Sequence, residues 1–371
     1  MNEHKSVPNI RFKGFEDEWK AVKINYIVNI KAGGDLEKNK LLKDGKYPVI
    51  GNTLKNNGII GYTNTFKIDA PAVTVTGRGE IGKAFYQPIP FTPVVRLLAL
   101  VPKNENIDMK FLSNEIENLN FFSESTGVPQ LTAPELGTYK VGLTECNEQQ
   151  KIGNLFFKLD KLLDLQQQKI DKLELLKKAL LQKLFPRHDA QIPEFRFKGS
   201  KDDWEKLRVE KIVKYSNSSY ILKNLKQKKE GRSYPVYDAT GRKYYSYSFD
   251  MCKKYIAIIK DGSNIGKVKL LPARTSVLST MGYLVANNSD LVFDYYLFEN
   301  LNFQKYKVGS GIPHIYFSDY KRQSEFVPQL SEQQKIGSLL SKVDQLIELE
   351  NKKLYNLQQV KKCLLQNMFV E

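Results

Sequence analysis

Apolar residues recur every three or four positions through residues 147–185, which read NEQQKIGNLFFKLDKLLDLQQQKIDKLELLKKALLQKLF. The apolar stripe consists of Ile152, Leu155, Leu159, Leu162, Leu173, Leu180 and Leu184, with polar Gln166 in its middle. This spacing places the apolar side chains on one face of a helix. Since a helix rises 1.5 Å per residue, the segment would span roughly 58 Å, a length that indicates a coiled-coil arm rather than a globular helix.

The same pattern returns at the end of the chain. Residues 331–369 read SEQQKIGSLLSKVDQLIELENKKLYNLQQVKKCLLQNMF, displaced by 184 positions, and 19 of the 39 positions are identical. Glu350 takes the place of Gln166, so the polar interruption is repeated. One polar residue on an apolar seam can fix the register of two helices. The chain is therefore built twice, and each half ends in a long helix.

The two halves also open alike, with PNIRFKGFEDEW at 8–19 and PEFRFKGSKDDW at 193–204. The two tryptophans of the chain hold matching positions in these segments. We expect both in the core at the first strand of each domain, with ligand stacking as the less favoured alternative. A Glu-x-Lys pattern at 18–20, part of some nuclease motifs, is lost in the second copy and has no Pro-Asp partner, so we discard it.

Short segments of β-branched and aromatic residues, separated by Gly, Pro and Asn, follow each opening and predict irregular, β-rich sheets. Short helical candidates lie at 109–122 and 293–303. The expected fold class is α+β, with two pseudo-repeated α/β domains separated by two long antiparallel coiled-coil helices. The expected boundaries are 1–146 for the first domain, 147–189 for the first long helix, 190–330 for the second domain and 331–371 for the second long helix.

The composition is that of a soluble globular protein, with 41% hydrophobic and 26% charged residues. No apolar run approaches the roughly 18 residues of a membrane helix. The first residues contain no apolar signal core, so we expect a cytoplasmic protein. The three cysteines and three histidines are scattered, which favours neither a disulfide framework nor a local metal site.

The net charge of +16 is unevenly distributed. It is +2 for residues 1–146, +3 for 147–185, +10 for 186–330 and +1 for 331–371. A basic excess favours polyanions, and the lack of a basic amphipathic helix argues against a membrane surface. Nucleic acid is therefore the leading partner.

GRGEIG at 77–82 is a literal Gly-x-Gly-x-x-Gly that follows a strand-like segment. A dinucleotide site requires a helix to begin there, whereas KAFYQP at 83–88 predicts another strand ended by proline. The counterpart DGSNIGK at 261–267 keeps the turn without the pattern. We therefore expect a β-hairpin with a basic turn in each half, and we reject a nucleotide site.

A second paired turn lies near the end of each domain, STGVPQL at 125–131 and GSGIPHI at 309–315. A plain tight turn and a nucleic-acid contact are equally good interpretations of it. Residues 30–70 and 215–250 hardly match beyond a shared Tyr-Pro-Val, so these segments would distinguish what the halves bind. Residues 221–254 interleave basic residues with tyrosines, which suits phosphate and base contacts.

Together these repeats resemble the DNA-specificity subunit of type I restriction–modification systems over nearly the whole chain. The resemblance rests on RFKGFEDEW at 11–19, RFKGSKDDW at 196–204, NEQQKIG at 147–153, SEQQKIG at 331–337 and VPQLSEQQKI at 327–336. The first copy departs from it, with Leu-Thr-Glu-Cys at 143–146 in place of the Val-Pro-Gln-Leu run. The resemblance implies two target-recognition domains, each reading half of a bipartite DNA sequence, with the helices setting the spacer.

The resemblance also implies that this subunit is not an enzyme. It would bind double-stranded DNA and two adenine-methylating modification subunits, and restriction subunits would join for ATP-driven translocation and cleavage. S-adenosylmethionine, ATP and Mg²⁺ would belong to these partners. The sequence agrees, since it contains neither an Asn/Asp-Pro-Pro-Tyr/Phe methylation motif nor a Gly-Lys-Ser/Thr phosphate loop.

The DNA-contact candidates are basic and polar residues of the turns and of the tyrosine-rich segment. They are Asn52, Lys55, Asn56, Arg78, Lys83 and Gln130 in the first domain, and Arg242, Lys243, Tyr244, Lys260, Asn264, Lys267 and His314 in the second. For part of this set, solvated surface charge is the plainer interpretation. One alternative function is a stand-alone nuclease or methyltransferase with a duplicated DNA-binding region, although no catalytic constellation is evident. A coiled-coil scaffold without DNA affinity would leave the basic second domain unexplained.

Overall fold

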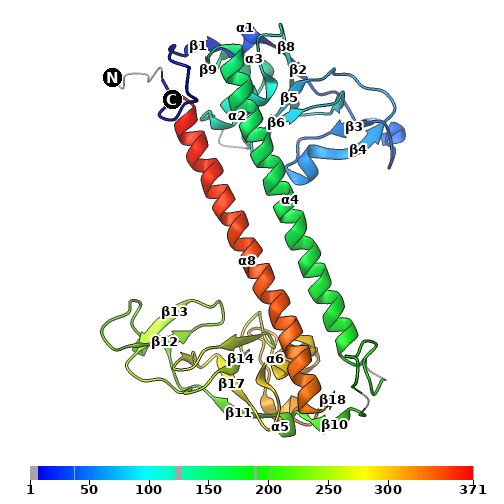
Figure 1. Ribbon diagram of the computed structural model, residues 1–371, viewed down its shortest axis with the longest axis vertical. Helices are drawn as coiled ribbons and strands as arrows, with labels where there is room; N and C mark the ends of the chain where they lie inside the picture. Colours follow the sequence, from blue (N-terminus) through cyan, green and yellow to red (C-terminus); the bar gives the residue numbers. More distant parts are fainter. Residues whose placement is uncertain (1–6, 37, 122–127, 188–189, 201, 371) are drawn as a thin grey trace. The chain divides into compact units, whose positions relative to one another are not determined.

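The computed structural model describes residues 7–36, 38–121, 128–187, 190–200 and 202–370. The chain divides into two compact units, Met1–Gln168 with Lys352–Glu371 and Lys169–Asn351. Each unit combines helices and sheets, and each contains part of both long helices (Figure 1).

The first unit contains three sheets. The strands are β1 Lys20–Lys23, β2 Val28–Ala32, β3 Tyr47–Ile50, β4 Ile59–Thr63, β5 Ala72–Thr76, β6 Ala84–Gln87, β7 Thr92–Pro93, β8 Leu97–Pro102 and β9 Lys140–Leu143. The short helices are α1 Ile24–Ile27, α2 Met109–Asn118 and α3 Ala133–Thr138, with 3-10 turns η1 Lys38–Lys40 and η2 Lys55–Gly58. The strands pair as β1–β9, as antiparallel β2–β8–β5–β6, and as β4–β3–β7, in which β3 and β7 are parallel.

The second unit repeats this order. Its strands are β10 Glu205–Arg208, β11 Val213–Asn217, β12 Tyr234–Tyr237, β13 Lys243–Ser246, β14 Tyr255–Ile259, β15 Val268–Leu271, β16 Ser276–Val277, β17 Met281–Ala286 and β18 Ser324–Val327. Its short helices are α5 Val209–Ile212, α6 Leu291–Asn300 and α7 Phe317–Tyr320, with 3-10 turns η3 Leu222–Asn224 and η4 Phe303–Tyr306. The sheets are β10–β18, β11–β17–β14–β15 and β13–β12–β16.

The small three-stranded sheets therefore have the same topology in both units, although their sequences hardly match. The shared Tyr-Pro-Val lies at the start of the central strand of each, β3 and β12. The central strands β5 and β14 are buried along all five residues, so each is covered on both faces. Sequence divergence thus altered side chains on a retained backbone.

Both tryptophans lie in the core, as predicted. Trp19 packs edge-to-face against Phe111 of α2, with ring centroids 5.5 Å apart, and its indole N–H donates to Glu148 Oε2 at 3.3 Å. Trp204 packs edge-to-face against Phe293 of α6, with centroids 6.2 Å apart. Each tryptophan directly precedes the first strand of its unit, β1 or β10.

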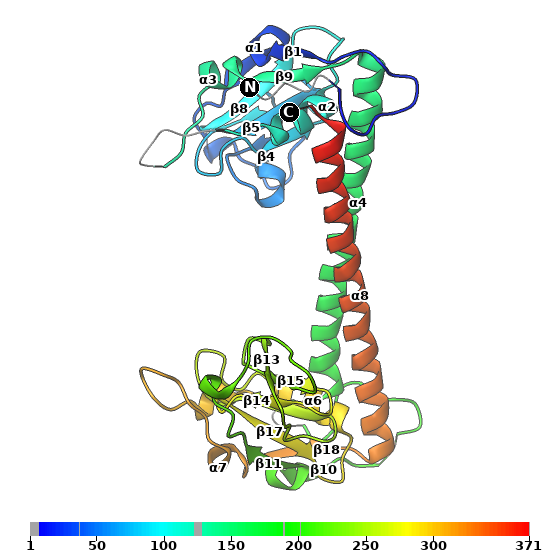
Figure 2. The ribbon, with the colours of Figure 1, turned by 90° about the vertical axis from the view of Figure 1, so that its left-hand side faces the viewer.

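The two long helices are α4 Cys146–Leu184 and α8 Leu330–Met368. In the first unit, Phe156 of α4 lies beside Phe369, just beyond the end of α8, and Asp160 forms a 2.7 Å ion pair with Lys361. In the second unit, Lys177 forms a 3.0 Å ion pair with Asp344 and Lys169 a 2.9 Å ion pair with Glu350. In each unit the contacting residues have rising numbers along α4 and falling numbers along α8, so the two helices are antiparallel there. Figure 2 shows them side by side. The predicted fold class is confirmed.

The apolar stripe of α4 differs from the expected one at two places. Leu162, expected on the seam, is 46% exposed, whereas its neighbour Leu163 is half-buried. Phe156 is fully buried, and Leu155 is half-buried. Steps of four and three residues from Ile152 reach Phe156, Leu159 and Leu163, which keeps the stripe on one side of the helix. Leu162 was therefore assigned to the seam wrongly.

The repeated Glu-Gln-Gln-Lys-Ile-Gly segment joins each long helix to its domain. In the first unit, buried Glu148 accepts two hydrogen bonds from the guanidinium of Arg11, at 2.7 and 2.8 Å. Glu332 makes the same two contacts with Arg196, at 3.1 and 2.7 Å. The Arg of each Arg-Phe-Lys-Gly opening is thus the partner of a Glu in the first turn of each long helix, which explains why both motifs recur together.

The first Gln and the Gly of the segment contact the N-terminus of α2 or α6. The side-chain oxygen of Gln149 accepts a hydrogen bond from the backbone N–H of Asp108 at 3.1 Å, and Gln333 accepts one from Asp290 at 2.8 Å. Both aspartates cap their helices. A Cβ at Gly153 would lie 2.4 Å from the Oδ1 of Asp108, so only glycine allows this approach.

Candidate nucleic-acid interface

In the first unit, the two predicted turns lie against each other. Residues 77–83 connect β5 to β6 as a β-hairpin, and no helix begins there, as expected from the sequence. The N–H of Gly79 donates to the Pro129 carbonyl at 3.0 Å, and the N–H of Leu131 donates to the Gly77 carbonyl at 2.8 Å. We refer to residues 77–83 and 128–131 as the first tip. Residues 125–127 of the expected second turn lie outside the described residues.

The second unit contains the same arrangement between β14 and β15. The N–H of Gly262 donates to the Pro313 carbonyl at 2.9 Å, and the N–H of Ile315 donates to the Lys260 carbonyl at 2.9 Å. We refer to residues 260–267 and 308–315 as the second tip. Both tips extend from the end of a four-stranded sheet, so a buried sheet supports the loops in each unit.

One isolated β-bridge joins the two turns of each tip. In the first tip it pairs Arg78 with Gln130, and in the second it pairs Asp261 with His314. His314 Nδ1 lies 2.8 Å from Asp261 Oδ1, and the imidazole stacks on Tyr316 with centroids 6.4 Å apart. The sequence patterns predicted Arg78, Gln130 and His314 as DNA contacts but not Asp261.

Asn52 supports the first tip rather than extending from it. Its side-chain oxygen accepts a hydrogen bond from the Gly77 N–H, and its amide nitrogen donates to the Arg78 carbonyl, both at 2.8 Å. Asn52 follows strand β3, so it connects the small sheet to the hairpin turn. The side-chain oxygen and nitrogen of Asn52 are therefore both used in hydrogen bonds to the backbone of Gly77 and Arg78.

Lys55 and Asn56 are exposed in the 3-10 turn η2, on the loop that begins at Asn52. Asn56 has a φ of +50°, which asparagine tolerates better than most residues. Lys83 is exposed at the start of β6 on the other side of the turn. The first unit therefore brings its six candidates to one region, the first tip and the adjoining loop.

The candidates of the second unit fall into two groups. Arg242 and Lys243 are exposed at the start of β13, and their cationic groups lie over the rings of Tyr244 and Tyr237, at 5.3 and 5.7 Å. Tyr244 itself is only 8% exposed, so its ring is part of the support of these cations. This group lies on the small sheet.

Lys260, Asn264 and Lys267 belong to the second tip together with His314. Asn264 and Lys267 are exposed, and Lys260 Nζ donates to Asn217 Oδ1 at 3.1 Å. Asn217 also accepts from Tyr215, whose pKa is raised by burial and by the carboxylate of Asp261. Positive charge on this tip is thus accompanied by one acidic group.

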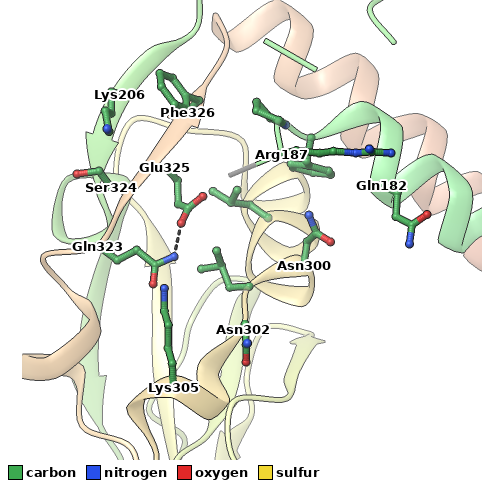
Figure 3. A pocket seen from close by; sticks show the side chains of 14 residues that line it. Gln182, Arg187, Lys206, Asn300, Asn302, Lys305, Gln323, Ser324, Glu325 and Phe326 are labelled. Carbon is green, nitrogen blue, oxygen red and sulfur yellow. Dashed lines mark hydrogen bonds between the residues drawn. The ribbon is translucent and has the colours of Figure 1, made fainter. Parts of the chain in front are cut away.

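A cavity of about 760 Å³ in the second unit lies between α6, β18 and the end of α4. Figure 3 shows Lys206, Lys305 and Arg187 around it, with Gln323 donating to Glu325. A cavity of about 520 Å³ in the first unit is lined by Tyr86, Lys110 and Phe157, among others. Within the described residues, no group of His, Cys, Asp and Glu side chains is placed to hold a metal ion.

The chain thus contains two α+β units, and each has a polar two-turn tip. In each unit the same Arg–Glu ion pair joins the domain to a long helix. This duplicated arrangement is that of a recognition protein. The chain belongs to the family of the type I restriction modification DNA specificity domain, which matches residues 16–175 and again residues 201–359. The family assignment made from the repeats is confirmed.

Named relatives agree with this assignment. A Mycoplasma pneumoniae protein, provisionally named type I specificity subunit S.MpnORF507P, is 33% identical over 141 residues, which cover 37% of this chain and 38% of the relative. The type I restriction enzyme MjaVIII specificity subunit of Methanocaldococcus jannaschii is 26% identical over 198 residues, covering 50% of this chain and 44% of the relative. These matches therefore span about two fifths of the relatives.

The fold agrees over nearly the whole chain. The crystal structure of a type I restriction–modification S subunit from M. genitalium has a TM-score of 0.75 with 17% identity, covering 98% of this chain and 99% of that one. Among the helices of the described ranges, none combines the length and the apolar character needed to cross a membrane.

Proposed function

We propose that this chain is the DNA-specificity subunit of a type I restriction–modification complex. Each unit reads one half of a bipartite double-stranded DNA sequence, and the long helices set the spacer between the halves. The observation that carries this proposal is that both units present the same two-turn tip with different side chains. A duplicated backbone with altered side chains suits two half-sites of different sequence.

In this proposal the chain is not an enzyme but directs partner subunits. Two modification subunits methylate adenine within the target, and restriction subunits translocate and cleave unmodified DNA. S-adenosylmethionine, ATP and Mg²⁺ bind to these partners, and the complex acts in the cytoplasm. Membership of the specificity-domain family supports this division of labour.

The alternative is a stand-alone DNA-modifying enzyme, either a nuclease or a methyltransferase. The family and the relatives are described by specificity rather than by catalysis, so they favour the first proposal. Purified alone, the chain should therefore neither methylate nor cleave DNA. Activity of the isolated chain that survives repeated purification would support the alternative.

The direct test is to express the chain with the modification subunit of its own system and map methylated adenines across the host DNA. We expect a split motif with a fixed gap. Replacing the target-recognition domain of one unit by that of a relative should alter only one half of the motif. An unsplit motif, or methylation without this chain, would contradict the proposal.

A further inference from the structure

The two tips carry opposite charge at equivalent positions. Counted from the shared bridge, Arg78 of the first tip corresponds to Asp261 of the second, and Gln130 corresponds to His314. The flanking backbone hydrogen bonds are the same in both tips, from Gly79 to Pro129 and from Gly262 to Pro313. The two units thus differ in side-chain chemistry at a point where their backbones agree.

We propose that this residue pair determines which base each unit accepts at one position of its half-site. Arg78 with Gln130 presents hydrogen-bond donors, and Asp261 with His314 presents a carboxylate acceptor. The inference rests on the proposed function, because it assigns a base-reading role to residues of the same tips.

The backbone at each pair is held by the rest of the unit. The Gly77 N–H donates to the Arg96 carbonyl at 2.9 Å, and Asn52 binds the Arg78 carbonyl. The N–H of Asp261 donates to the Thr280 carbonyl at 3.2 Å. Because these contacts fix where the Cα atoms lie, the side chain is what varies between the tips.

The side chains are accessible at both tips. The side chain of Asp261 is 27% exposed and that of His314 is 37% exposed. Arg78 is half-buried and Gln130 exposed, and Arg78 makes no ion pair within the described part of the chain. Its guanidinium is therefore available to an external acceptor.

An exposed aliphatic residue accompanies each pair. Val128, two residues before Gln130, is 55% exposed, and Ile312, two residues before His314, is 65% exposed. Single exposed aliphatic side chains are normal on protein surfaces, so these two bear on the proposal only because they hold the same place in both tips. A thymine methyl group or a base step is a suitable partner for such a side chain.

The base preferences follow from hydrogen-bond chemistry. A guanidinium donates to the O6 and N7 of guanine, and a glutamine amide pairs with adenine. A carboxylate accepts from the exocyclic amino group of cytosine. His314 Nδ1 faces Asp261 Oδ1, so the imidazole orients the carboxylate and Oδ2 remains for a base. The guanidinium of Arg78 therefore favours guanine at the position it reads, and the carboxylate of Asp261 favours a base that offers an exocyclic amino group.

The test is an exchange of the pairs in the complex of the full chain with its modification subunit, read by mapping methylated adenines. The Asp261→Arg, His314→Gln double variant should shift one position of the second half-site toward guanine, with a preference change of roughly 5- to 150-fold. The first half-site should stay unchanged. Arg78→Asp with Gln130→His should produce the reciprocal change.

Asp261→Asn is the second variant, to be used if the double variant fails to fold. It keeps the size of the side chain and replaces the carboxylate, which only accepts hydrogen bonds, by an amide that also donates. It should relax discrimination at the same single position. An unaltered second half-site in either variant, or equal loss at both half-sites, would overturn the inference. A wild-type map without a split motif would instead overturn the proposed function, and the inference with it.

Discussion

The Nε of Arg11 donates to Glu148 Oε1 at 2.7 Å, and this contact joins the first residues of the chain to the start of helix α4. Both side chains are largely shielded from water, and the hydrogen bond to Glu148 raises the pKa of Arg11. Removing one partner of a shielded pair leaves the other charge without compensation.

We therefore expect Glu148→Gln to lower the free energy of unfolding by about 3 kcal/mol. Glu332→Gln, which breaks the equivalent pair with Arg196 in the second unit, should have a similar effect. Urea unfolding followed by circular dichroism measures both. Glu174→Gln, on the exposed side of α4, is the control and should change the value by less than about 0.5 kcal/mol. Equal effects at all three positions would contradict the structural role.

The long helices approach α2 and α6 through equivalent glycines, and the approach is closer in the first unit. A Cβ at Gly153 would lie 2.4 Å from Asp108 Oδ1 and 2.7 Å from the Phe111 nitrogen, whereas the nearest atom to a Cβ at Gly337 is the Phe293 nitrogen at 3.0 Å. Gly153→Ala should destabilise by roughly 1–3 kcal/mol because a backbone atom must move. At Gly337 the clash is milder, and alanine gains about 1 kcal/mol of helix propensity, so Gly337→Ala should be nearly neutral.

The measurement is a comparison of the thermal unfolding midpoints of the two alanine variants in the same buffer. Gly153→Ala should have the clearly lower midpoint. The reverse order would show that the first junction is looser than the structure describes.

Burial raises the pKa of Glu115 to about 8, although the Gly142 N–H donates to its carboxyl group. The folded protein therefore keeps a proton that the unfolded chain releases above its ordinary pKa of 4.5. Because the folded state binds more protons in this range, the stabilisation is present at lower pH and is lost as pH rises from about 4.5 to about 8.

Glu115→Gln, which stays neutral, should make stability less dependent on pH across this range. Urea unfolding at pH 5.5 and pH 8.5 compares the two proteins, and the wild type should lose more between them. Asp294→Asn offers the matching test in the second unit, since burial raises the pKa of Asp294 to about 8 as well. A wild type that gained stability with rising pH in this range would argue against a buried neutral Glu115.

Asn52 is expected to act on DNA recognition through Arg78. Asn52→Ala removes the hydrogen bond to the Arg78 carbonyl. The backbone of Arg78 is then held less firmly, so its guanidinium is less well positioned. Affinity for the first half-site should fall roughly 10-fold at most, with the second half-site as the internal control. Titration of the complex with DNA that carries one intact and one scrambled half-site measures this. Equal weakening at both half-sites would indicate a general loss of folding.

The salt dependence of DNA affinity should distinguish the lysine present in both tips from the two cations found only in the second unit. Lys83 and Lys267 are exposed at matching places, so Lys83→Ala and Lys267→Ala should each reduce the slope of log affinity against log salt by about 0.9. Arg242 directly precedes β13 and Lys243 is its first residue, and the corresponding strand β4 contains no basic residue. Their joint replacement by alanine should reduce the slope by about 1.8. An unchanged slope in the double variant would place β13 away from the phosphates.

Local regularities predicted the parts of this protein that repeat. Period and length indicated the two long helices, and matching openings and turns indicated two α+β units with a hairpin tip in each. The seam was misplaced at Leu162 because Leu162 and Leu163 are both apolar, and spacing alone does not select between adjacent leucines. Asp261 was not predicted because a carboxylate is repelled by phosphates and is therefore unexpected on a surface that binds DNA.

The sequence by itself determined the duplication, the helical arms and the family, because periodicity and repetition are properties of chain order. Only the tertiary structure showed that Arg11 and Arg196 bind the glutamates at the start of the long helices. It also showed that Asn52 supports the turn beside Arg78, and that Asp261 occupies the place of Arg78 in the second unit. These relationships join positions far apart in the chain, so local propensity alone does not predict them.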